Sequence, residues 1–311
     1  MNRLTEQKII LITQKTRLEN LITRYNTAGQ AKFYVESHGG SFDDYILEDK
    51  LYRAAVKKTV DFAETYGRLQ VIDRDFIPNF IFGENDLVIV VGRDGLVVNT
   101  LKYLNKQKLI GINPDPDRWD GVLLPFRADD VSKIIPETVN NIRQVKSVTF
   151  AQAKLNDGQS LIGVGDIFIG QKTHVSARYE LSIGNLKETQ SSSGIIVSTG
   201  LGATGWLKSI LAGAEGINRY YKGNSRLETE SNFKCDSRCL YYSVREPYPS
   251  NSTGTQIVFG KIKEREKLSI TSYMPENGVI FSDGMEQDFL EFNSGTKAEI
   301  GVCQKCGNLV V

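Results

Sequence analysis

Residues 86–96, with the sequence DLVIVVGRDGL, decide the fold of the first part of the chain. The apolar run has the length and composition of one strand buried on both faces, as in a parallel sheet. It ends abruptly in a turn where Asp94 stands between Gly92 and Gly95. Open α/β sheets place ligands at the carboxyl ends of their strands, so this turn is a candidate phosphate-binding loop. Arg93 departs from the pattern, because it puts a long cation where a glycine is expected, and a tight turn without a ligand is the alternative.

The segments around this stretch continue an α/β pattern. Residues 96–105 have helical spacing, residues 108–112 form the next apolar strand, and residues 129–145 return to helical spacing. Strand, turn, helix and strand in this order predict a βαβ unit with a right-handed crossover. Upstream, residues 67–75 contain a short alternating strand.

The first 66 residues have a helical pattern. Apolar residues recur at helical spacing over residues 5–25, and a second amphipathic segment covers about residues 48–66. The stretch between them, residues 29–44, is polar. We therefore predict that residues 1–66 form a helical extension packed on the first domain.

From about residue 147 the pattern is mostly that of strands. Residues 212–251, which are polar and rich in Asn and Ser, are predicted to form a helix and an irregular excursion. The expected architecture is a Rossmann-like α/β domain at residues 67–145, followed by a β-rich, β-sandwich-like domain at residues 146–311. Strands are expected at residues 147–154, 161–169, 177–183, 195–198, 256–260, 267–273, 278–282 and 296–302.

Composition narrows the classes of partner. The 311 residues include 38 Lys and Arg against 37 Asp and Glu, a net charge of +1, so no global field attracts nucleic acid or an anionic membrane. No apolar run approaches the roughly 18 residues that span a bilayer, and the N-terminus leads into no signal-peptide core. We expect a cytoplasmic protein with no nucleic-acid or membrane partner.

A second glycine-rich turn lies within residues 195–206, IIVSTGLGATGW, where an apolar strand leads into a helical pattern. Hydroxyls and backbone N–H groups ahead of a helix form a natural anion or ribose site. A tryptophan at the end adds a flat surface for an adenine or nicotinamide ring. The alternative is a turn between two elements with that tryptophan in the core. The candidate ligand residues are Ser198, Thr199, Gly200, Gly202, Thr204 and Trp206.

Three further polar residues are candidates: Asn113 and Asp283 each follow an expected strand, and Asp166 stands just before an apolar pair. Asn113 opens a loop that two prolines keep extended, with several acids beside it, and Asp166 and Asp283 each stand at a glycine-containing turn. An exposed acidic loop and ordinary turn residues are the alternatives.

The order and spacing of these segments resemble the NAD kinase family, and the mitochondrial-type branch most closely. In that family a Gly-Gly-Asp-Gly-Thr motif follows a strand, and VGRDGL at residues 91–96 occupies its place. The resemblance covers roughly residues 67–311. Its other motifs here are INPDP at 112–116, GDIFIG at 165–170, SARYE at 176–180, SSG at 192–194, the turn ending in Trp206, SVREP at 243–247 and SDG at 282–284.

The resemblance implies phosphoryl transfer from ATP or a related donor to the 2′-hydroxyl of the adenosine ribose of NAD(H), giving NADP(H). Asp94 would be the general base or orienting carboxylate, and Gly92, Arg93 and Gly95 would lie beside the donor phosphates. Mg²⁺ would arrive with ATP, without a protein-bound metal, and the chain would form a homo-oligomer, a dimer or tetramer. The dinucleotide would contact Asn113, Asp166, Ser198, Thr199, Gly200, Gly202, Thr204, Trp206 and Asp283.

Three departures from the family pattern leave other functions open. Arg93 replaces the second glycine, Leu96 removes a threonine hydroxyl, and Gly165 replaces an asparagine. Arg93 is either a phosphate clamp or a side chain that points to solvent. The alternatives are a catalytically degenerate nucleotide-binding homologue, acting as a sensor or partner protein, and a kinase acting on a sugar or lipid hydroxyl.

The cysteines form two close pairs, Cys235 with Cys239 and Cys303 with Cys306. A reducing compartment argues against structural disulfides. We expect reduced thiols in ordinary turns, with a zinc site as the less favoured alternative. His38 and His174 have no second histidine near enough in sequence to suggest a metal pair.

Overall fold

The chain folds into two compact units. Unit 1 comprises Met1–Lys146 and Gly307–Val311, and unit 2 comprises Ser147–Cys306. An α/β unit is followed by a β-rich unit, so the predicted fold class is confirmed. The C-terminal residues from Gly307 onward, which the sequence pattern assigned to the β-rich domain, lie in unit 1. The computed structural model describes residues 3–222, 233–285 and 288–311.

Unit 1 is built on a parallel sheet with the strand order β2–β1–β3–β4. β5 (Phe126–Arg127) and the end of β17 (Lys297–Val310) pair with β4 in parallel. The continuous apolar composition of the central strands follows from burial on both faces. The four strands are β1 (Lys8–Thr13), β2 (Arg68–Asp73), β3 (Leu87–Val91) and β4 (Lys108–Asn113).

The expectation that residues 1–66 form a helical extension is wrong for β1. Its sequence, KIILIT, is a short apolar run rich in β-branched residues, and β1 lies between β2 and β3 with Ile9 to Ile12 fully buried. A run of this length fits a buried strand or part of a buried helix equally well by periodicity. Its place in the sheet comes from pairing with residues about 60 to 80 positions away.

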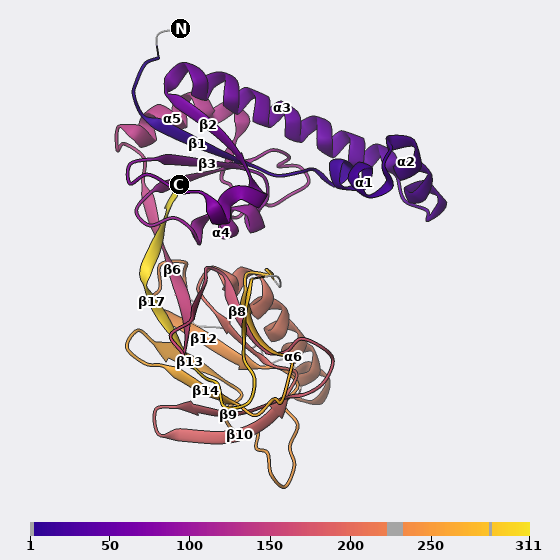
Figure 1. Ribbon diagram of the computed structural model, residues 1–311, viewed down its shortest axis with the longest axis vertical. Helices are drawn as coiled ribbons and strands as arrows, with labels where there is room; N and C mark the ends of the chain where they lie inside the picture. The colour runs from indigo at the N-terminus through magenta and orange to yellow at the C-terminus, as the bar shows by residue number, and fades with distance from the viewer. Residues whose placement is uncertain (1–2, 223–232, 286–287) are drawn as a thin grey trace. The chain divides into compact units, whose positions relative to one another are not determined.

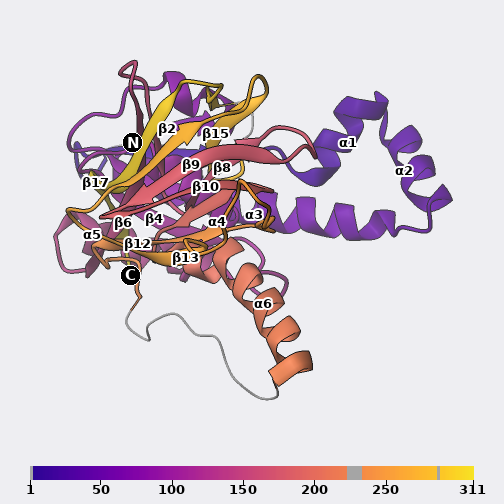
Figure 2. The same ribbon diagram turned by 90° about the horizontal axis from the view of Figure 1, so that it is seen from below.

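Three helices follow β1. They are α1 (Arg17–Tyr25), α2 (Ala28–Ser37) and the long α3 (Phe42–Tyr66). Thr16 and Glu19 form a capping box that starts α1, which fixes the change from strand to helix. The polar stretch 29–44 is mostly helical. α1 and α2 lie beside the N-terminal part of α3, away from the sheet (Figure 2).

The predicted βαβ unit is present as β3, α4 (Asp94–Leu101) and β4. α3 and α5 (Val131–Val139) cover one face of the sheet, where apolar residues of both helices share a core cluster with the strands. α4 lies on the other face (Figure 1). Short 3₁₀ turns at Arg74–Asn79 and Ala128–Asp130 complete the unit. The carboxyl ends of β3 and β4 are thus adjacent.

Unit 2 is a sandwich of two largely antiparallel sheets around one apolar core. One sheet has the order β13–β12–β11–β8–β15–β16, and the other contains β10, β9, β14 and β17, with β6 pairing β17 and β7. α6 (Trp206–Lys222) follows the short turn Gly202–Thr204. The strands are β6 (Val145–Leu155), β7 (Ser160–Gly163), β8 (Asp166–Gln171), β9 (Ala177–Ile183), β10 (Leu186–Ser192), β11 (Ile195–Ser198), β12 (Cys239–Val244), β13 (Phe259–Lys263), β14 (Leu268–Ser272), β15 (Gly278–Ser282) and β16 (Phe289–Glu291).

Two expectations for unit 2 need correction. The single strand expected at residues 161–169 is two strands, β7 and β8, because the backbone of residues 164–166 turns to meet a side chain of a later loop. The segment 212–251 contains β12, paired with β11 and β13, while its residues 223–232 lie outside the described part. Where the chain is described, none of its helices is both long enough and apolar enough to cross a membrane.

Candidate functional site

The expected phosphate loop lies at the carboxyl end of β3, where the strand passes directly into α4. The backbone N–H of Gly92 donates to the carbonyl oxygen of Ile112 at 3.2 Å, so the turn begins against the neighbouring strand. A Cβ atom on Gly92 would lie 2.9 Å from Cδ2 of Leu96, which is buried. Gly92 therefore lets the first turn of α4 pack closely on the strand end. Gly95 is exposed, with open space where a Cβ would stand.

Arg93 takes an extended backbone conformation, with φ −116° and ψ 166°. The left-handed conformation that would strain a residue with a side chain is not used here. Its Nη2 lies 2.7 Å from Oε1 of Glu48, and its guanidinium carbon lies 3.9 Å from the centre of the Trp119 ring. The side chain is 38% exposed. Arg93 is therefore held by an acid and an aromatic ring of its own unit and does not extend freely into solvent.

Asp94 is the first residue of α4 and is half-buried. Its Oδ1 accepts a hydrogen bond from the backbone N–H of Leu123 at 2.8 Å. A carboxylate in the first turn of a helix is also favoured by the helix dipole. Asp94 thus joins the start of α4 to the loop that follows β4.

Arg93 is one of three arginines that meet at Glu48. Arg17 pairs with Glu48 and lies 3.0 Å from Asp44, and Nη1 of Arg118 lies 3.5 Å from Glu48. Arg118 also lies 2.8 Å from Asp44. The hydrogen bond from Arg17 is the main cause that holds the pKa of Asp44 below its usual range. The loop thus borders an ion-pair network.

Asn113 is buried at the end of β4, and both ends of its amide are used within its own loop. Oδ1 accepts from the N–H of Asp115 at 3.0 Å, and Nδ2 donates to the carbonyl oxygen of Trp119 at 2.9 Å. Asn side chains commonly organise turns by this kind of bond. Asn113 therefore shapes the loop that carries Trp119 to Arg93.

In unit 2, the carboxylate of Asp283 receives three consecutive backbone N–H groups. Oδ2 accepts from Val164 at 3.0 Å, and Oδ1 accepts from Gly165 at 2.7 Å and from Asp166 at 3.2 Å. Asp283 has φ +55°, a left-handed conformation that Asp tolerates better than most residues. A Cβ atom on Gly165 would lie 3.3 Å from Oδ1 of Asp283, so the missing side chain at 165 has a structural reason.

Asp166 is a candidate carboxyl group with a strongly raised pKa. It begins β8, opposite Ser198 of β11. Burial, and secondly the charge of Asp283, raise its pKa to about 7. A carboxyl group with such a pKa has both protonation states available near neutral pH, as is common at functional sites.

The hydroxyl groups of the second glycine-rich turn are engaged within the turn. Oγ1 of Thr199 donates to the carbonyl oxygen of Val164 at 2.6 Å and accepts from the N–H of Gly202 at 3.3 Å. Oγ of Ser198 donates to the carbonyl oxygen of Thr199 at 3.1 Å. Both residues are fully buried, so their hydroxyls stabilise the turn.

Two glycines of this turn allow close backbone packing. A Cβ on Gly200 would lie 1.7 Å from the carbonyl oxygen of Lys234, and one on Gly202 would lie 2.1 Å from that of Gly165. Neither approach is compatible with a side chain. Backbone packing alone therefore requires glycine at positions 200 and 202 of this turn, with or without a ligand.

Thr204 and Trp206 lie at the start of α6. Oγ1 of Thr204 donates to the carbonyl oxygen of Leu201 at 3.0 Å. The partly buried Trp206 ring is nearly parallel to Phe168, with ring centres 6.0 Å apart, and the guanidinium of Arg245 lies 5.6 Å from it. Trp206 is thus part of an apolar cluster on the six-stranded sheet.

The structure brings the predicted residues together in two groups, one in each unit. Unit 1 groups the Gly92–Gly95 turn with Asn113 at adjacent strand ends, and unit 2 groups Asp166, Asp283 and the 198–202 turn. Glu48 and its partners Arg17 and Arg118 were not among the residues predicted from the sequence, whereas Arg93 was. Their only signal is an arginine shortly after each of three strands, which becomes visible once β1 is recognised.

None of the four cysteines, all of which lie in the described residues, forms a disulfide bond. In the described ranges, 3–222, 233–285 and 288–311, no group of three or more His, Cys, Asp and Glu side chains is placed to hold a metal ion.

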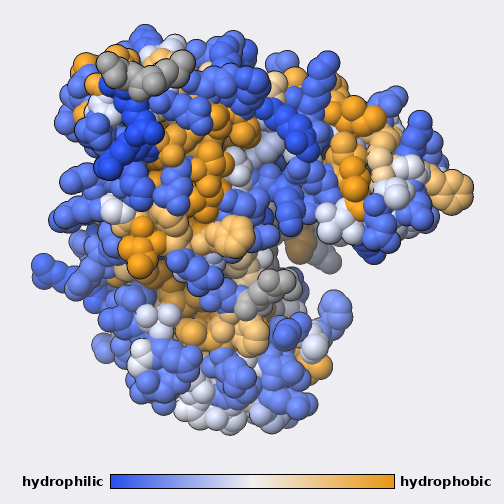
Figure 3. Space-filling model, turned by 45° about the horizontal axis from the view of Figure 1, so that its top comes forward, coloured by the Kyte–Doolittle hydropathy of each residue, from blue (hydrophilic) through white to orange (hydrophobic). Residues whose placement is uncertain are grey.

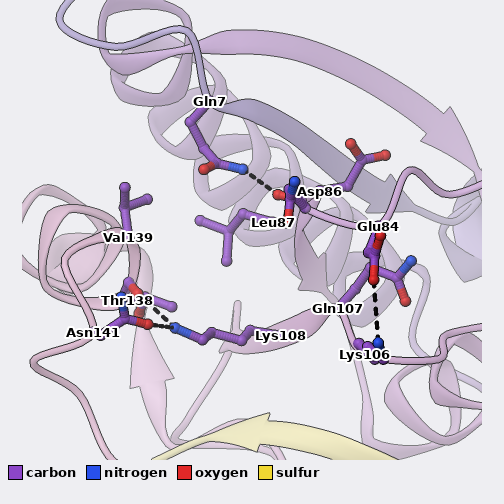
Figure 4. Close-up of a pocket in the computed structure, with 11 residues that line it drawn as sticks. Gln7, Glu84, Asp86, Leu87, Lys106, Gln107, Lys108, Thr138, Val139 and Asn141 are labelled. Carbon is purple, nitrogen blue, oxygen red and sulfur yellow. Dashed lines mark hydrogen bonds and ion pairs between the residues drawn. The ribbon is translucent and has the colours of Figure 1, made fainter.

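One pocket of unit 1, of about 290 Å³, lies at the amino ends of β3 and β4, the edge opposite the phosphate loop. Figure 4 shows Lys108 reaching toward Thr138 and Asn141, and Lys106 paired with Glu84. Lys108 thereby satisfies a carbonyl at the C-terminal end of α5.

A second pocket of unit 1, of about 510 Å³, lies between α1 and α2 and includes Tyr25, Phe33 and Tyr34. Apolar side chains reach the surface in this part of unit 1 (Figure 3), and Phe33 is largely exposed. Neither pocket contains a predicted site residue.

Comparisons with known proteins point to one group of enzymes. No family model matches the chain. NAD kinase 2 of Geobacillus kaustophilus is 25% identical over 170 residues, which cover 53% of this chain and 60% of that protein. A probable NADH kinase of Oryza sativa subsp. japonica is 24% identical over 223 residues, which cover 64% of this chain and 63% of that protein. The chain thus matches about three fifths of the length of these relatives.

Two solved structures share the fold. Yeast NADH kinase complexed with NADH has a TM-score of 0.62 at 13% identity, covering 99% of this chain and 84% of that one. An NAD kinase from Archaeoglobus fulgidus in complex with ATP has a TM-score of 0.56 at 14% identity, and the match covers 98% of this chain and 94% of that one. The chain is thus similar in sequence to curated NAD and NADH kinases and shares its fold with the two solved kinase structures.

Proposed function

We propose that the chain is an NAD(H) kinase-like phosphotransferase. It transfers a phosphoryl group from ATP or a related donor to the 2′-hydroxyl of the adenosine ribose of NAD(H), giving NADP(H). The observation that carries the proposal is a half-buried carboxylate, Asp94, in the first turn of the helix after β3, in a chain with the fold of an NADH kinase.

Asp94 orients the ribose hydroxyl and accepts its proton in this proposal. Oδ1 is bonded to the Leu123 N–H, so we assign this role to Oδ2. Phosphoryl transfer requires little covalent chemistry from the protein and depends on positioning and electrostatic stabilisation. The bond from Leu123 supports such positioning, because it fixes the rotation of the carboxylate.

We assign dinucleotide contacts in unit 2 to the group around Asp166, while in unit 1 Asn113 shapes its own loop with both ends of its amide. The hydroxyls of Ser198 and Thr199 are used inside their turn, so their contribution is to hold the turn in shape. Asp166, with a pKa of about 7, is the unit 2 carboxyl group that we assign to a hydroxyl or amide of the ligand.

Mg²⁺ is proposed to arrive with the donor phosphates. Mg²⁺ keeps several waters and commonly binds through one or two carboxylates plus substrate phosphates. That preference fits Asp94, a single carboxylate at the loop that accepts one hydrogen bond from the Leu123 N–H. When bound, the ion would neutralise the charge of the donor phosphates. Residues of the chain would position them.

The experiment is to incubate the purified protein with NAD or NADH, ATP or polyphosphate, and Mg²⁺, and to measure NADP(H). We expect product with the parent chain and at least about a 100-fold loss in Asp94→Asn. Activity that survives Asp94→Asn or Asp94→Ala would remove Asp94 from the role. Asp43→Asn is a matched control, because Asp43 is an exposed acid on α3.

A second candidate function is nucleotide binding without turnover. The buried Leu96 in place of a hydroxyl, and the pairing of Arg93 with Glu48, favour it. Calorimetry that detects NAD(H) or NADP(H) binding with no product in the assay would select this reading. Product formed only with sugar or lipid acceptors would instead indicate a kinase acting on another hydroxyl. A homo-oligomer stays an expectation from the family resemblance, and a cytoplasmic location stays a prediction from the sequence.

A further inference from the structure

Three arginines of unit 1 lie just beyond the carboxyl ends of three neighbouring parallel strands. Arg17 follows β1, Arg93 follows β3 and Arg118 follows β4. This is the sheet edge where open α/β folds bind their ligands. The three guanidinium groups converge there on one carboxylate, that of Glu48.

Glu48 occupies the point of convergence. Oε1 lies 2.7 Å from Arg93, while Oε2 pairs with Arg17 and lies 3.5 Å from Arg118. Its side chain is 12% exposed, whereas the arginines are 21% to 38% exposed. Three guanidiniums around one anion form an anion-binding arrangement, because each offers a fork of N–H donors.

The arginines are also held independently of Glu48. Arg93 lies on Trp119 and Arg17 lies on Tyr45, with guanidinium carbons 3.9 Å and 4.6 Å from the ring centres. Stacking on a ring uses the face of the guanidinium and leaves its N–H edge available. Arg118 is held by carboxylates, with Asp115 at 3.1 Å and Asp44 at 2.8 Å. The three groups thus keep anchors when Glu48 moves.

We propose that Arg17, Arg93 and Arg118 form the binding site for the polyphosphate chain of the donor, and that Glu48 is an internal anion which occupies this site until the donor binds. The inference deepens the proposed function and rests on it for the identity of the donor. Arg93, which breaks the glycine pattern, is in this account a donor-binding residue. The competing structural role is that Glu48 only clamps α3 to the sheet edge.

The two roles differ in what removal of the Glu48 charge does to anion binding. Glu48→Gln keeps the shape and a carbonyl oxygen but removes the internal anion. With inorganic tripolyphosphate and EDTA, titration calorimetry is expected to show about a tenfold lower Kd for Glu48→Gln than for the parent. Asp43→Asn makes the same charge change on the exposed side of α3 and is expected to leave Kd within about twofold.

The double variant Glu48→Gln, Arg93→Ala tests whether the higher tripolyphosphate affinity of Glu48→Gln depends on the arginines. It is expected to lose the added affinity. If Glu48→Gln melts cooperatively and binds tripolyphosphate no more tightly than the parent, the internal-anion role is wrong. If the double variant keeps the gain, Arg93 is not part of the site.

Arg93→Lys and Arg118→Lys in the otherwise unchanged chain give a second route if Glu48→Gln does not fold. Each keeps the charge but loses the planar fork, and each is expected to raise the tripolyphosphate Kd severalfold. Unchanged Kd values in both would overturn the proposal. Calorimetry detects binding without turnover. Tripolyphosphate binding without NADP(H) formation would therefore support the anion site and contradict the proposed kinase activity.

Discussion

The two glycine-containing turns of this chain follow buried strands but are stabilised in opposite ways. The unit 1 turn borders partly exposed ion pairs around Glu48, with long side chains that have alternative partners. The unit 2 turn is fixed by buried hydroxyls and by glycines packed against backbone carbonyls. Ion pairs near the surface contribute little to stability, whereas close backbone packing permits almost no change. We infer that the first turn is suited to exchanging anions and the second to presenting a rigid surface.

The largest effect expected from this comparison is on stability at Gly202. Gly202→Ala places a Cβ 2.1 Å from the carbonyl oxygen of Gly165, and is expected to destabilise unit 2 by about 3 kcal/mol or more. Urea unfolding followed by circular dichroism measures the change. Gly213→Ala, in the interior of α6 with open space at its Cβ, is the control and is expected to be neutral or stabilising. Equal effects at both positions would contradict the packing argument.

The next effect compares the two carboxylates that accept backbone N–H groups. Asp283 accepts three such bonds and Asp94 accepts one. Replacement by Asn puts an amide donor where one carboxylate oxygen accepts. We therefore expect the free energy of unfolding to fall by about 2–3 kcal/mol in Asp283→Asn and by about 1 kcal/mol in Asp94→Asn. Chemical denaturation measures both. A larger loss at Asp94 would mean that the unit 1 turn is the more rigid of the two.

The pH dependence of stability provides a third test. The folded-state pKa of Asp166 is about 7, above the roughly 3.9 of an unfolded chain. The folded state therefore binds a proton that the unfolded state has lost, and this contribution to stability falls as pH rises from about 4 to 7. Asp166→Asn removes it. The variant should gain stability relative to the parent as pH increases through this window, and a constant difference would argue against the raised pKa.

The smallest stability effect is expected at Arg93. Because the Arg93 side chain is 38% exposed, Arg93→Ala should lower the free energy of unfolding by no more than about 1 kcal/mol. A loss as large as that at Gly202 would show that the ion-pair network is a structural clamp, which would remove the contrast between the two turns.

The sequence pattern identified the parts of the fold that depend on local signals. The buried strand β3, the turn after it and most strands of unit 2 have continuous or alternating apolar runs with clear ends. β1 was misread, because a run of this length satisfies helical and strand periodicity alike. The sequence around the end of β17 does not indicate that this strand joins the sheet of unit 1. Its position there depends on pairing with β4, about 200 positions earlier.

The candidate residues show the same limit. Asp94, Asp166 and Asp283 stand in recognisable turns, but the cause of the pKa of Asp166 lies in burial and in a side chain more than 100 positions away. Glu48 lies within a helix, where a lone acid has no distinguishing pattern. Its meeting with three arginines is a tertiary property.

The most direct test of the account is a single-turnover reaction with γ-labelled ATP, Mg²⁺ and NADH, in which the destination of the labelled phosphate is measured. The label is expected to appear in NADPH with the parent chain and to be lost from that product in Asp94→Asn. Label that appears only as inorganic phosphate, or stays in ATP although NADH is bound, would contradict it.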